Sequence, residues 1–364
     1  MMDAESVIRA HVREMDTYQP IYPFEVLAQR LGRTPEEIVK LDANENPYGT
    51  HPAVLEALGE LAYAHIYPDP ECSALREAIA ARIGVPVENI MAGAGADELI
   101  DLIVRLFLEP GETLLNCPPT FGMYAFDAGV NAVKLINVPR REDFSLDVTA
   151  LDRALDEHRP KLLFLASPNN PDGGVLAFED LERLLARPLV VVLDEAYVQF
   201  AKPGSSRVGE VLARQNLIVL QTFSKWAGLA GMRVGYGVFP GRLMPYLWKI
   251  KQPYNVSAAA AKAAIASLEN MEALLETVET IKSERMRLYE LLEQVPFLLP
   301  YPSQANFVLC KVVGRPAAQL KQTLEGAGIL VRYFDKPGLG DHIRISVGKP
   351  AHTDALLNAL AAME

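Results

Sequence analysis

The sequence predicts an α/β protein with a large domain built on a mostly parallel sheet and a smaller α+β domain at the C-terminal end. Three observations carry this prediction. The chain has 364 residues, and a chain of this length usually folds into two domains, because a single hydrophobic core does not grow to this size. Short apolar runs alternate with helical patterns over most of its length. The pattern then changes at about Ser257, where a long run without proline or glycine begins.

The expected strands of the large domain are short apolar runs that end in polar or glycine-rich turns. Segment 89–108 predicts a strand, a small-residue turn and an amphipathic helix. Several runs are apolar at consecutive positions, as in strands covered on both faces. A parallel sheet of this kind places its ligand site at the C-terminal ends of the strands. Further strands are expected at 113–117, 132–138, 161–167, 188–194, 216–222 and 234–239.

Three regions of the chain are distinguished by these patterns. Residues 1–40 have two short helical patterns around a proline-rich turn, which predicts an arm packed on the small domain. Residues 41–256 form the large domain, and residues 257–364 form an interdomain helix and the small domain. The small domain is expected to contain one or two long helices at 257–293, strands at 306–312, 329–334 and 342–348, and helices at 317–328 and 353–364.

Composition narrows the class of protein. The net charge of −11 argues against a nucleic-acid partner, because phosphate neutralisation needs a basic face. The longest apolar stretches are shorter than the roughly 20 residues that span a bilayer, so no membrane partner is expected. The N-terminal residues are polar and do not predict a secretory signal. Cys72, Cys117 and Cys310 have neither metal-ligand nor disulfide spacing, which favours a cytoplasmic protein without a metal site.

Lys225 lies in the most distinctive segment of the chain, TFSKWAGLAGMRVGY (222–236). This segment follows an expected strand, is rich in hydroxyls and glycines, and places Lys225 eight residues before Arg233. A single lysine in a loop is usually just solvated. Its interpretation as a functional residue therefore depends on other segments.

Three such segments follow expected strands. VVVLDEAY (190–197) ends its apolar run at Asp194, where α/β enzymes place functional carboxylates, although a carboxylate there could equally cap a helix. SPNNPDGG (167–174) would, by itself, be an ordinary Asn-Pro/Asp-Gly turn. GAGADEL (93–99) precedes a helix, whose free N-terminal NH groups bind phosphate, although a tight strand–helix turn uses the same glycines.

In this chain order and with these spacings, the four segments resemble those of the fold-type I pyridoxal 5′-phosphate (PLP) enzymes, in their aminotransferase branch. The resemblance extends from about Tyr18 to Val347. It implies the fold of a fold-type I PLP-transferase and PLP as the cofactor. It also implies a homodimer, in which Tyr67 reaches the phosphate bound by the neighbouring subunit.

The resemblance assigns a role to each matching residue near the cofactor ring. Lys225 would carry PLP as a Schiff base and then move a proton between the substrate Cα and the cofactor. Asp194 would keep the pyridine nitrogen protonated, which makes the ring an electron sink. Asn170 and Tyr197 would donate to the phenolic oxygen and so lower the proton affinity of the Schiff base. Phe121 would stack on the ring, unless it is an ordinary core aromatic.

The same resemblance implies a phosphate site. An arginine suits it, because the guanidinium fork matches phosphate oxygens. Its donors would be the backbone NH groups of Gly95, Ala96 and Asp97, the hydroxyls of Thr222 and Ser224, and the side chain of Arg233.

The segment KLDANENPYG (40–49) narrows the resemblance to the histidinol-phosphate aminotransferases, together with YPDP, PPTFGMY and SPNNPDGG. That family binds a substrate phosphate where other aminotransferases bind a carboxylate. Arg344 matches its C-terminal substrate arginine and would share this phosphate with Arg332. Tyr18 would close over the same group, and Asn44 would line the substrate channel.

The implied reaction converts L-histidinol phosphate and 2-oxoglutarate to imidazole-acetol phosphate and L-glutamate, by ping-pong kinetics. A threonine-phosphate decarboxylase or an aromatic amino-acid aminotransferase of the same fold is the main alternative. A dinucleotide-binding enzyme is a remote one, because position 98 is Glu where the G-x-G-x-x-G pattern needs glycine. A structural or interaction protein would leave Lys225 and Asp194 unexplained.

Overall fold

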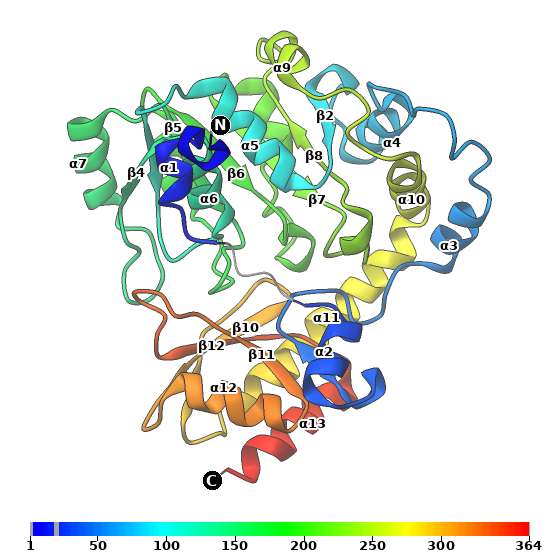
Figure 1. The fold of residues 1–364 in the computed structure, drawn as a ribbon, viewed down its shortest axis with the longest axis vertical. Helices are drawn as coiled ribbons and strands as arrows, with labels where there is room; N and C mark the ends of the chain where they lie inside the picture. Colours follow the sequence, from blue (N-terminus) through cyan, green and yellow to red (C-terminus); the bar gives the residue numbers. More distant parts are fainter. Residues whose placement is uncertain (1–2, 18–21, 364) are drawn as a thin grey trace.

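The computed structural model describes residues 3–17 and 22–363. Its larger unit is built on a seven-stranded sheet with the strand order β2-β8-β7-β6-β5-β3-β4 (Figure 1). Neighbouring strands run parallel except at β8, which is antiparallel to both β2 and β7. The prediction of a mostly parallel sheet is therefore confirmed. The strands are β2 (Ile90–Gly93), β3 (Thr113–Asn116), β4 (Lys134–Asn137), β5 (Leu162–Ala166), β6 (Val190–Asp194), β7 (Leu217–Thr222) and β8 (Gly235–Val238).

Helices cover both faces of this sheet, which explains its consecutive apolar positions. In β6, Val191 and Leu193 pack in one hydrophobic cluster and Val192 packs in another, because successive strand residues point to opposite faces. The first cluster includes residues of α7 and α8, and the second includes residues of α5 and α6. The helices of this unit are α3 (Pro52–Gly59), α4 (Ser73–Ile83), α5 (Ala96–Phe107), α6 (Met123–Val130), α7 (Val148–His158), α8 (Phe178–Leu185) and α9 (Met244–Ile250).

The smaller unit is a five-stranded sheet with the order β1-β11-β12-β10-β9, with α10 and α11 leading into it from the larger unit. The long run at 257–293 forms two helices, α10 (Ala258–Glu269) and α11 (Met271–Leu292). The sheet includes β1 (Val39–Leu41), which lies parallel to β11, so the boundary expected between residues 40 and 41 falls within a strand. The remaining elements are β9 (Leu298–Pro300), β10 (Phe307–Val312), α12 (Ala317–Gly326), β11 (Ile329–Tyr333), β12 (His342–Ser346) and α13 (Pro350–Ala361).

The N-terminal arm differs from the expectation that it packs on the small domain. Its first helix, α1 (Ala10–Arg13), contacts α6 of the larger unit, and His11 Nε2 lies 3.3 Å from the carbonyl oxygen of Val130. By contrast, α2 (Phe24–Leu31) joins the smaller unit, where Leu27 packs with Leu330 of β11. The last arm residues, Val39 and Lys40, lie in β1 of its sheet. The arm is thus divided between the two units: none of the residues of α1 is buried where it contacts α6, whereas α2 buries Leu27 against the smaller unit.

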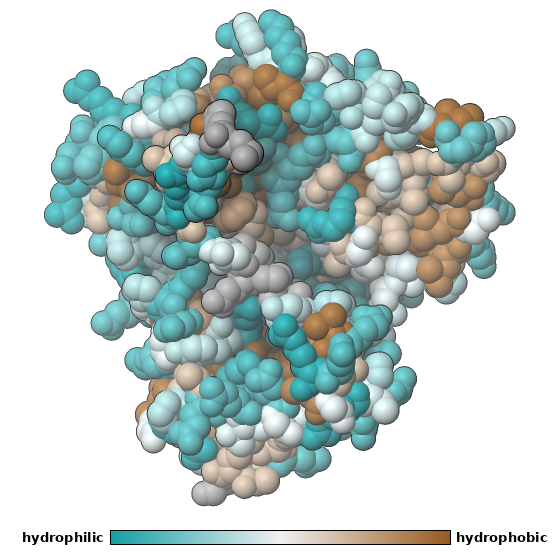
Figure 2. All heavy atoms as spheres, viewed as in Figure 1, coloured by the Kyte–Doolittle hydropathy of each residue, from teal (hydrophilic) through white to brown (hydrophobic). Residues whose placement is uncertain are grey.

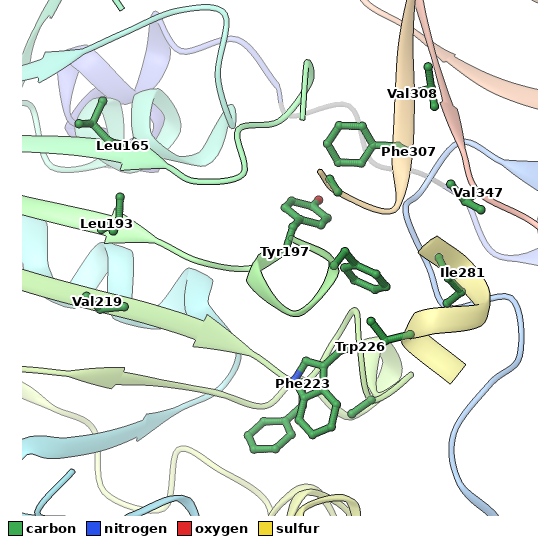
Figure 3. Packing of buried hydrophobic residues seen from close by; sticks show 14 of the residues in the cluster. Leu165, Leu193, Tyr197, Val219, Phe223, Trp226, Ile281, Phe307, Val308 and Val347 are labelled. Atoms are coloured by element: carbon green, nitrogen blue, oxygen red, sulfur yellow. The ribbon is translucent and has the colours of Figure 1, made fainter. Parts of the chain in front are cut away.

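One hydrophobic cluster runs from the large sheet into the smaller unit (Figure 3). Leu193 and Val219 come from strands β6 and β7, and Phe307 and Val308 come from β10. Tyr197 lies between these two groups, beyond the C-terminal end of β6. The strand ends of the large sheet therefore face the smaller unit across a packed boundary, and this is where the functional site lies.

Candidate active site

A cavity of about 130 Å³ opens at the C-terminal ends of β5, β6 and β7, beside the N-terminus of α5. Strand ends collect here because parallel strands finish at the same edge of the sheet. The last residues of these three strands are Ala166, Asp194 and Thr222, and all three line the cavity. Its lining residues are Ala96, Asp97, Phe121, Ala166, Asn170, Asp194, Ala196, Tyr197, Thr222, Ser224, Lys225, Ala230 and Arg233.

Ten residues expected around a cofactor lie in this lining, although they come from segments well separated in the chain. They are Ala96, Asp97, Phe121, Asn170, Asp194, Tyr197, Thr222, Ser224, Lys225 and Arg233. Gly95 is the N-cap of α5 and lies against Arg233. The fold therefore brings these predicted residues together in space.

Lys225 follows β7 and extends its amine into this cavity. Its Nζ donates to the carbonyl oxygen of Ala43 over 3.3 Å and lies 5.9 Å from the centre of the Tyr197 ring. Both are weak contacts for an ammonium group, one long hydrogen bond and one distant aromatic face. The amine is thus held at the cavity without a carboxylate partner within ion-pairing distance in the described part of the chain.

Asp194 is buried and accepts two hydrogen bonds. Tyr124 donates its hydroxyl to Oδ2 over 2.8 Å, and the backbone NH of Ala196 donates to Oδ1 over 3.0 Å. Burial raises the pKa of Asp194 to about 6, and the two hydrogen bonds oppose that rise. The carboxylate is therefore still mostly ionised at neutral pH, and it presents a negative charge to the cavity.

Tyr124 was not among the residues selected from the sequence. It lies in the quoted PPTFGMY segment and starts α6 beside Met123, where it is fully buried. Its ring stacks on Phe164 with 5.0 Å between centroids, and Phe121 approaches it edge-on at 5.7 Å. A buried tyrosine needs a partner for its hydroxyl, and Asp194 is that partner. The signal available in the sequence was the position of Tyr124, three residues after Phe121, the residue expected to stack on the ring.

A cluster of donors gathers where α5 begins. The hydroxyls of Thr222 and Ser224 lie 3.0 Å apart, and both line the cavity. Arg233 donates to Asp97 Oδ2 over 2.6 Å in a half-exposed ion pair, and its backbone is left-handed with φ 52°. Gly95 is required here because its φ of 82° is a backbone conformation that other residues rarely adopt, and a Cβ on it would also lie 2.7 Å from the Arg233 guanidinium. Two hydroxyls, one guanidinium and free helix NH groups form a site suited to a phosphate.

Asn170 links the cavity to the smaller unit. Arg344 of β12 donates through Nη1 to Asn170 Oδ1 over 2.5 Å, and through Nη2 to the carbonyl oxygen of Asp42 over 2.8 Å. Arg344 is buried, and Arg332 lies directly opposite it on the neighbouring antiparallel strand β11. Neither arginine lines the cavity itself. The two arginines belong instead to strands β11 and β12 of the smaller unit, which faces the cavity.

Asn44 is buried next to Tyr197. Its Nδ2 donates to the Tyr197 hydroxyl over 3.1 Å, and its Oδ1 accepts from the Ser346 hydroxyl over 2.8 Å. The ring of Tyr197 packs edge-on against Phe307, with 5.1 Å between centroids (Figure 3). The side chain of Asn44 therefore contacts protein on both sides and is absent from the cavity lining.

Two further polar groups missed by the sequence analysis support the strand-end turns. Asn169 is fully buried, donates to Asp172 and to the Pro119 carbonyl oxygen, and accepts from the Thr120 hydroxyl.

Glu195 accepts from Ser206, from the backbone NH of Arg207 and from Gln221, and burial raises its pKa to about 7. Tyr236 donates to Gln221 in the same network over 2.7 Å. These bonds hold the loops around Asn170 and Asp194 in place.

Tyr67 lies away from the cavity and is 80% exposed. Its ring stacks on Tyr254 with centroids 4.7 Å apart, at the edge of a surface hollow formed with residues of 60–68 and α10. Figure 2 shows apolar side chains gathered over α3 and the segment after it. The exposed apolar side chains of this surface, called here the Tyr67 surface, are Leu55, Tyr63, Ile66, Tyr67 and Tyr254. Tyr18, the other expected aromatic, lies outside the described residues.

Metal and membrane interactions were not expected from the sequence. Among residues 3–17 and 22–363, no group of three or more His, Cys, Asp or Glu side chains is placed to hold a metal ion. In the same part of the chain no helix is long and apolar enough to cross a membrane.

The cavity fits the cofactor that the resemblance implies. A primary amine, a buried carboxylate and a phosphate-binding cluster are the three groups that PLP needs at its aldehyde, its pyridine nitrogen and its phosphate. They lie around one space, with Phe121 and Ala196 also in its lining. The glycine at position 95 keeps the phosphate cluster open, since any side chain there would displace Arg233.

Comparison with known proteins agrees with this geometry. Residues 36–362 match the family described as aminotransferase class I and II. The chain is 53% identical over 357 residues to the chloroplastic histidinol-phosphate aminotransferase of Nicotiana plumbaginifolia, covering 98% of this chain and 86% of the relative. It is 49% identical over 363 residues to the histidinol-phosphate aminotransferase of Roseiflexus castenholzii, covering 97% of each. The crystal structure of the Sinorhizobium meliloti histidinol-phosphate aminotransferase in complex with PLP is similar over 100% of both chains, with a TM-score of 0.88 at 29% identity.

Proposed function

Because this chain belongs to the class I and II aminotransferase family, we propose that it transfers the amino group of L-histidinol phosphate to 2-oxoglutarate, with PLP bound at Lys225. The chain is a PLP-dependent transaminase of histidine biosynthesis. The proposal adds 2-oxoglutarate as the amino acceptor and a role for each residue of the site. The observation that carries the proposal is the single cavity shared by Lys225, Asp194 and the phosphate cluster.

Lys225 is the group that binds the cofactor and moves the proton. When bound, PLP supplies a ring that accepts the electron pair released at the Cα of the amino donor. Among the described residues, the Nζ of Lys225 donates to the Ala43 carbonyl oxygen and lies near the Tyr197 ring but forms no ion pair, so it would be available to bond to the cofactor. Once free of the cofactor, the same nitrogen would take up the Cα proton of the amino donor as a general base and then release it as a general acid.

Asp194 controls the charge of the ring. Its carboxylate accepts from Tyr124 and from the NH of Ala196, and this leaves it ionised at neutral pH despite complete burial. An ionised carboxylate in a buried site strongly favours a protonated pyridine nitrogen opposite it. Tyr124 therefore supports the acid–base state of the site through Asp194.

The phosphate of PLP is held at the N-terminus of α5. Thr222 and Ser224 donate hydroxyls, Arg233 contributes its guanidinium, and the helix terminus offers the NH groups of Ala96 and Asp97. The Gly95 NH was expected to join them, but it donates to the carbonyl oxygen of Gly93 over 2.8 Å. The Asp97 side chain holds Arg233 in this position by their ion pair. Phe121, which lines the cavity, would stack on the ring of the cofactor.

Arg332 and Arg344 bind the anionic end of each substrate. The two side chains lie opposite each other on β11 and β12, and two guanidinium groups match the charge of a phosphate dianion. The same pair accepts a carboxylate of glutamate in the second half-reaction. Asn170 and Tyr197 donate to the phenolic oxygen of the cofactor, and Arg344 holds the Asn170 amide for this contact.

A homodimer is the proposed assembly, with Tyr67 reaching the partner's phosphate site. The Tyr67 surface supports this, because a contiguous group of exposed apolar side chains marks an interaction site. A cytoplasmic location is proposed on the basis of Cys72, Cys117 and Cys310, all of which are free thiols buried in the fold.

Two measurements test the proposed function. Borohydride reduction of the purified holoenzyme should attach the cofactor to Lys225, and Lys225→Ala should abolish both the adduct and transamination. A half-reaction screen then presents histidinol phosphate, phenylalanine, tyrosine and threonine phosphate separately, and histidinol phosphate should bleach the lysine-bound cofactor band most efficiently. Carbon dioxide release from threonine phosphate, without amino transfer to 2-oxoglutarate, would instead identify a decarboxylase.

A further inference from the structure

Asn44 is held by four hydrogen bonds in a strained position. It is 1% exposed, and its φ of 54° is left-handed, which asparagine tolerates better than most residues. Its NH donates to Ser346 Oγ over 2.8 Å, and its carbonyl oxygen accepts from Asn306 Nδ2 over 3.0 Å. Its side chain accepts from Ser346 Oγ over 2.8 Å and donates to the Tyr197 hydroxyl over 3.1 Å. Strain that is maintained by so many bonds is typical of a functional position.

The contacts of Ser346 fix the direction of the Asn44 amide. Ser346 Oγ already accepts a hydrogen bond from the Asn44 backbone NH, and its own proton is donated to Asn44 Oδ1. The Nδ2 end of the amide must then face Tyr197. With the amide reversed, Tyr197 would donate its proton to Asn44, and the Ser346 proton would lose this acceptor.

The Tyr197 hydroxyl consequently accepts from Asn44 and keeps its own proton for another partner. A phenol carries one proton, so this partner is found elsewhere around the oxygen. Tyr197 lines the cavity that contains Lys225 and Asp194, and its ring cannot turn freely because Phe307 packs edge-on against it. The remaining direction for the donated proton is the cavity.

We propose that Asn44 and Ser346 are positioning residues that make Tyr197 a hydrogen-bond donor to the phenolic oxygen of the cofactor. The proposal rests on the proposed function, because it concerns the same site. Asn44 therefore acts through Tyr197, and its amide is not a substrate contact. Ser346 is on β12 two residues after Arg344, on the same strand face, so one strand carries both the substrate arginine and the residue that orients Tyr197.

The pH titration of the lysine-bound cofactor band measures this effect independently of turnover. A donor at the phenolic oxygen stabilises its negative charge and so lowers the pH midpoint of the band shift. Tyr197→Phe should raise the midpoint. Asn44→Gly removes the amide while tolerating the left-handed backbone, and should raise it by roughly half a pH unit, the scale of one weakened hydrogen bond. Ser346→Ala should move it in the same direction.

Two comparisons separate positioning from a general loss of structure. Ser267→Ala removes another buried hydroxyl, one that bonds only within α10, and should leave the midpoint unchanged. Asn44→Gly combined with Tyr197→Phe should give the midpoint of Tyr197→Phe alone, because Asn44 acts only through Tyr197.

An unchanged midpoint in Asn44→Gly and Ser346→Ala holoenzymes would overturn the proposal, and so would an additive shift in the double variant. If Asn44→Gly does not fold, Ser346→Ala alone decides the outcome. Absence of a borohydride-trapped adduct in the unsubstituted protein would instead reject the proposed function itself.

Discussion

Arg332 and Arg344 lie directly opposite each other on antiparallel strands, and both guanidinium groups lie over the ring of Phe334, at 5.6 and 5.5 Å from its centre. Like charges in cross-strand pairs destabilise a sheet. The Phe334 ring offsets part of this cost, because each cation is attracted to the π-system of the ring. The proposed function assigns the anionic end of the substrate to this pair.

Arg332→Gln should therefore have opposite effects on stability and on catalysis. We expect the free energy of unfolding of the unliganded protein to rise by about 0.5 kcal/mol at low salt, and the gain to shrink as salt screens the charges. We expect kcat/KM for histidinol phosphate to fall roughly 10- to 100-fold, since a charged hydrogen bond to phosphate is lost.

The control for this substitution is Arg315→Gln, which removes another small-domain arginine that lies over an aromatic ring, Phe297. Denaturant unfolding and half-reaction kinetics should show no loss of substrate efficiency there. An equal loss in both variants would show that Arg332 acts through general stability of the small domain.

The raised pKa of Asp194 predicts a pH limit for cofactor binding. Because its folded pKa is about 6, the carboxyl takes up a proton as the pH falls through 6, and the protonated form no longer offers an ionised partner to the pyridinium. The affinity of the apoprotein for PLP should then fall by up to about tenfold per pH unit below 6.

Equilibrium titration with PLP from pH 8 to pH 5 measures this dependence. Asp194→Asn is the matched control, because it retains any titration of the ligand phosphate but has no carboxyl to protonate. Its affinity should be lower throughout and depend less on pH. Identical pH profiles for the two proteins would exclude Asp194 as the titrating group.

Tyr124→Phe should weaken PLP binding through Asp194. The hydrogen bond from Tyr124 lowers the pKa of that carboxyl, so its removal should shift the pH limit upward and reduce PLP affinity about 3- to 10-fold at neutral pH. The phenylalanine keeps the stacking on Phe164. Tyr236→Phe removes an equally buried hydroxyl that bonds to Gln221 outside the cavity lining, and PLP affinity should be retained. Similar losses in both would point to packing instead.

A hybrid dimer tests whether Tyr67 acts across subunits. Tyr67→Ala and Lys225→Ala homodimers should each have little activity. Coexpression gives mixed dimers in which one site has both Lys225 and the partner's Tyr67 intact, so activity should recover to about a quarter of the wild-type value for random pairing. If Tyr67 serves its own subunit, mixing restores nothing. Ile66→Glu, on the same surface, should shift the protein towards monomer in size-exclusion chromatography.

The features that the sequence predicted best are those with a local cause. Asp194 and Thr222 were expected at the ends of apolar runs, and they are the last residues of β6 and β7. The glycine-rich turn at 93–96 was expected to open a helix, and α5 begins at Ala96. Consecutive apolar residues, turn residues and helix starts are properties of short segments, so one sequence contains them in full.

Features that depend on distant pairing were missed. The strand β1 has three residues, too few for any periodic pattern, and exists because it pairs with β11, 290 residues later in the chain. Tyr124 was not predicted as a site residue, because no local pattern connects it to Asp194, 70 residues away. The division of the N-terminal arm between two units likewise follows from the surfaces that α1 and α2 meet.

The sequence by itself determined the order of elements, the strand-end location of the site and the residues able to bind an amine-linked cofactor. Only the tertiary structure decided the direction of the side chains within it. Asn44 was expected in the substrate channel, and its amide faces Tyr197 because Ser346, 302 residues away, takes its oxygen. The physical reason is that an amide or hydroxyl has several possible partners, and the packing of remote strands selects which of them lies within hydrogen-bonding distance.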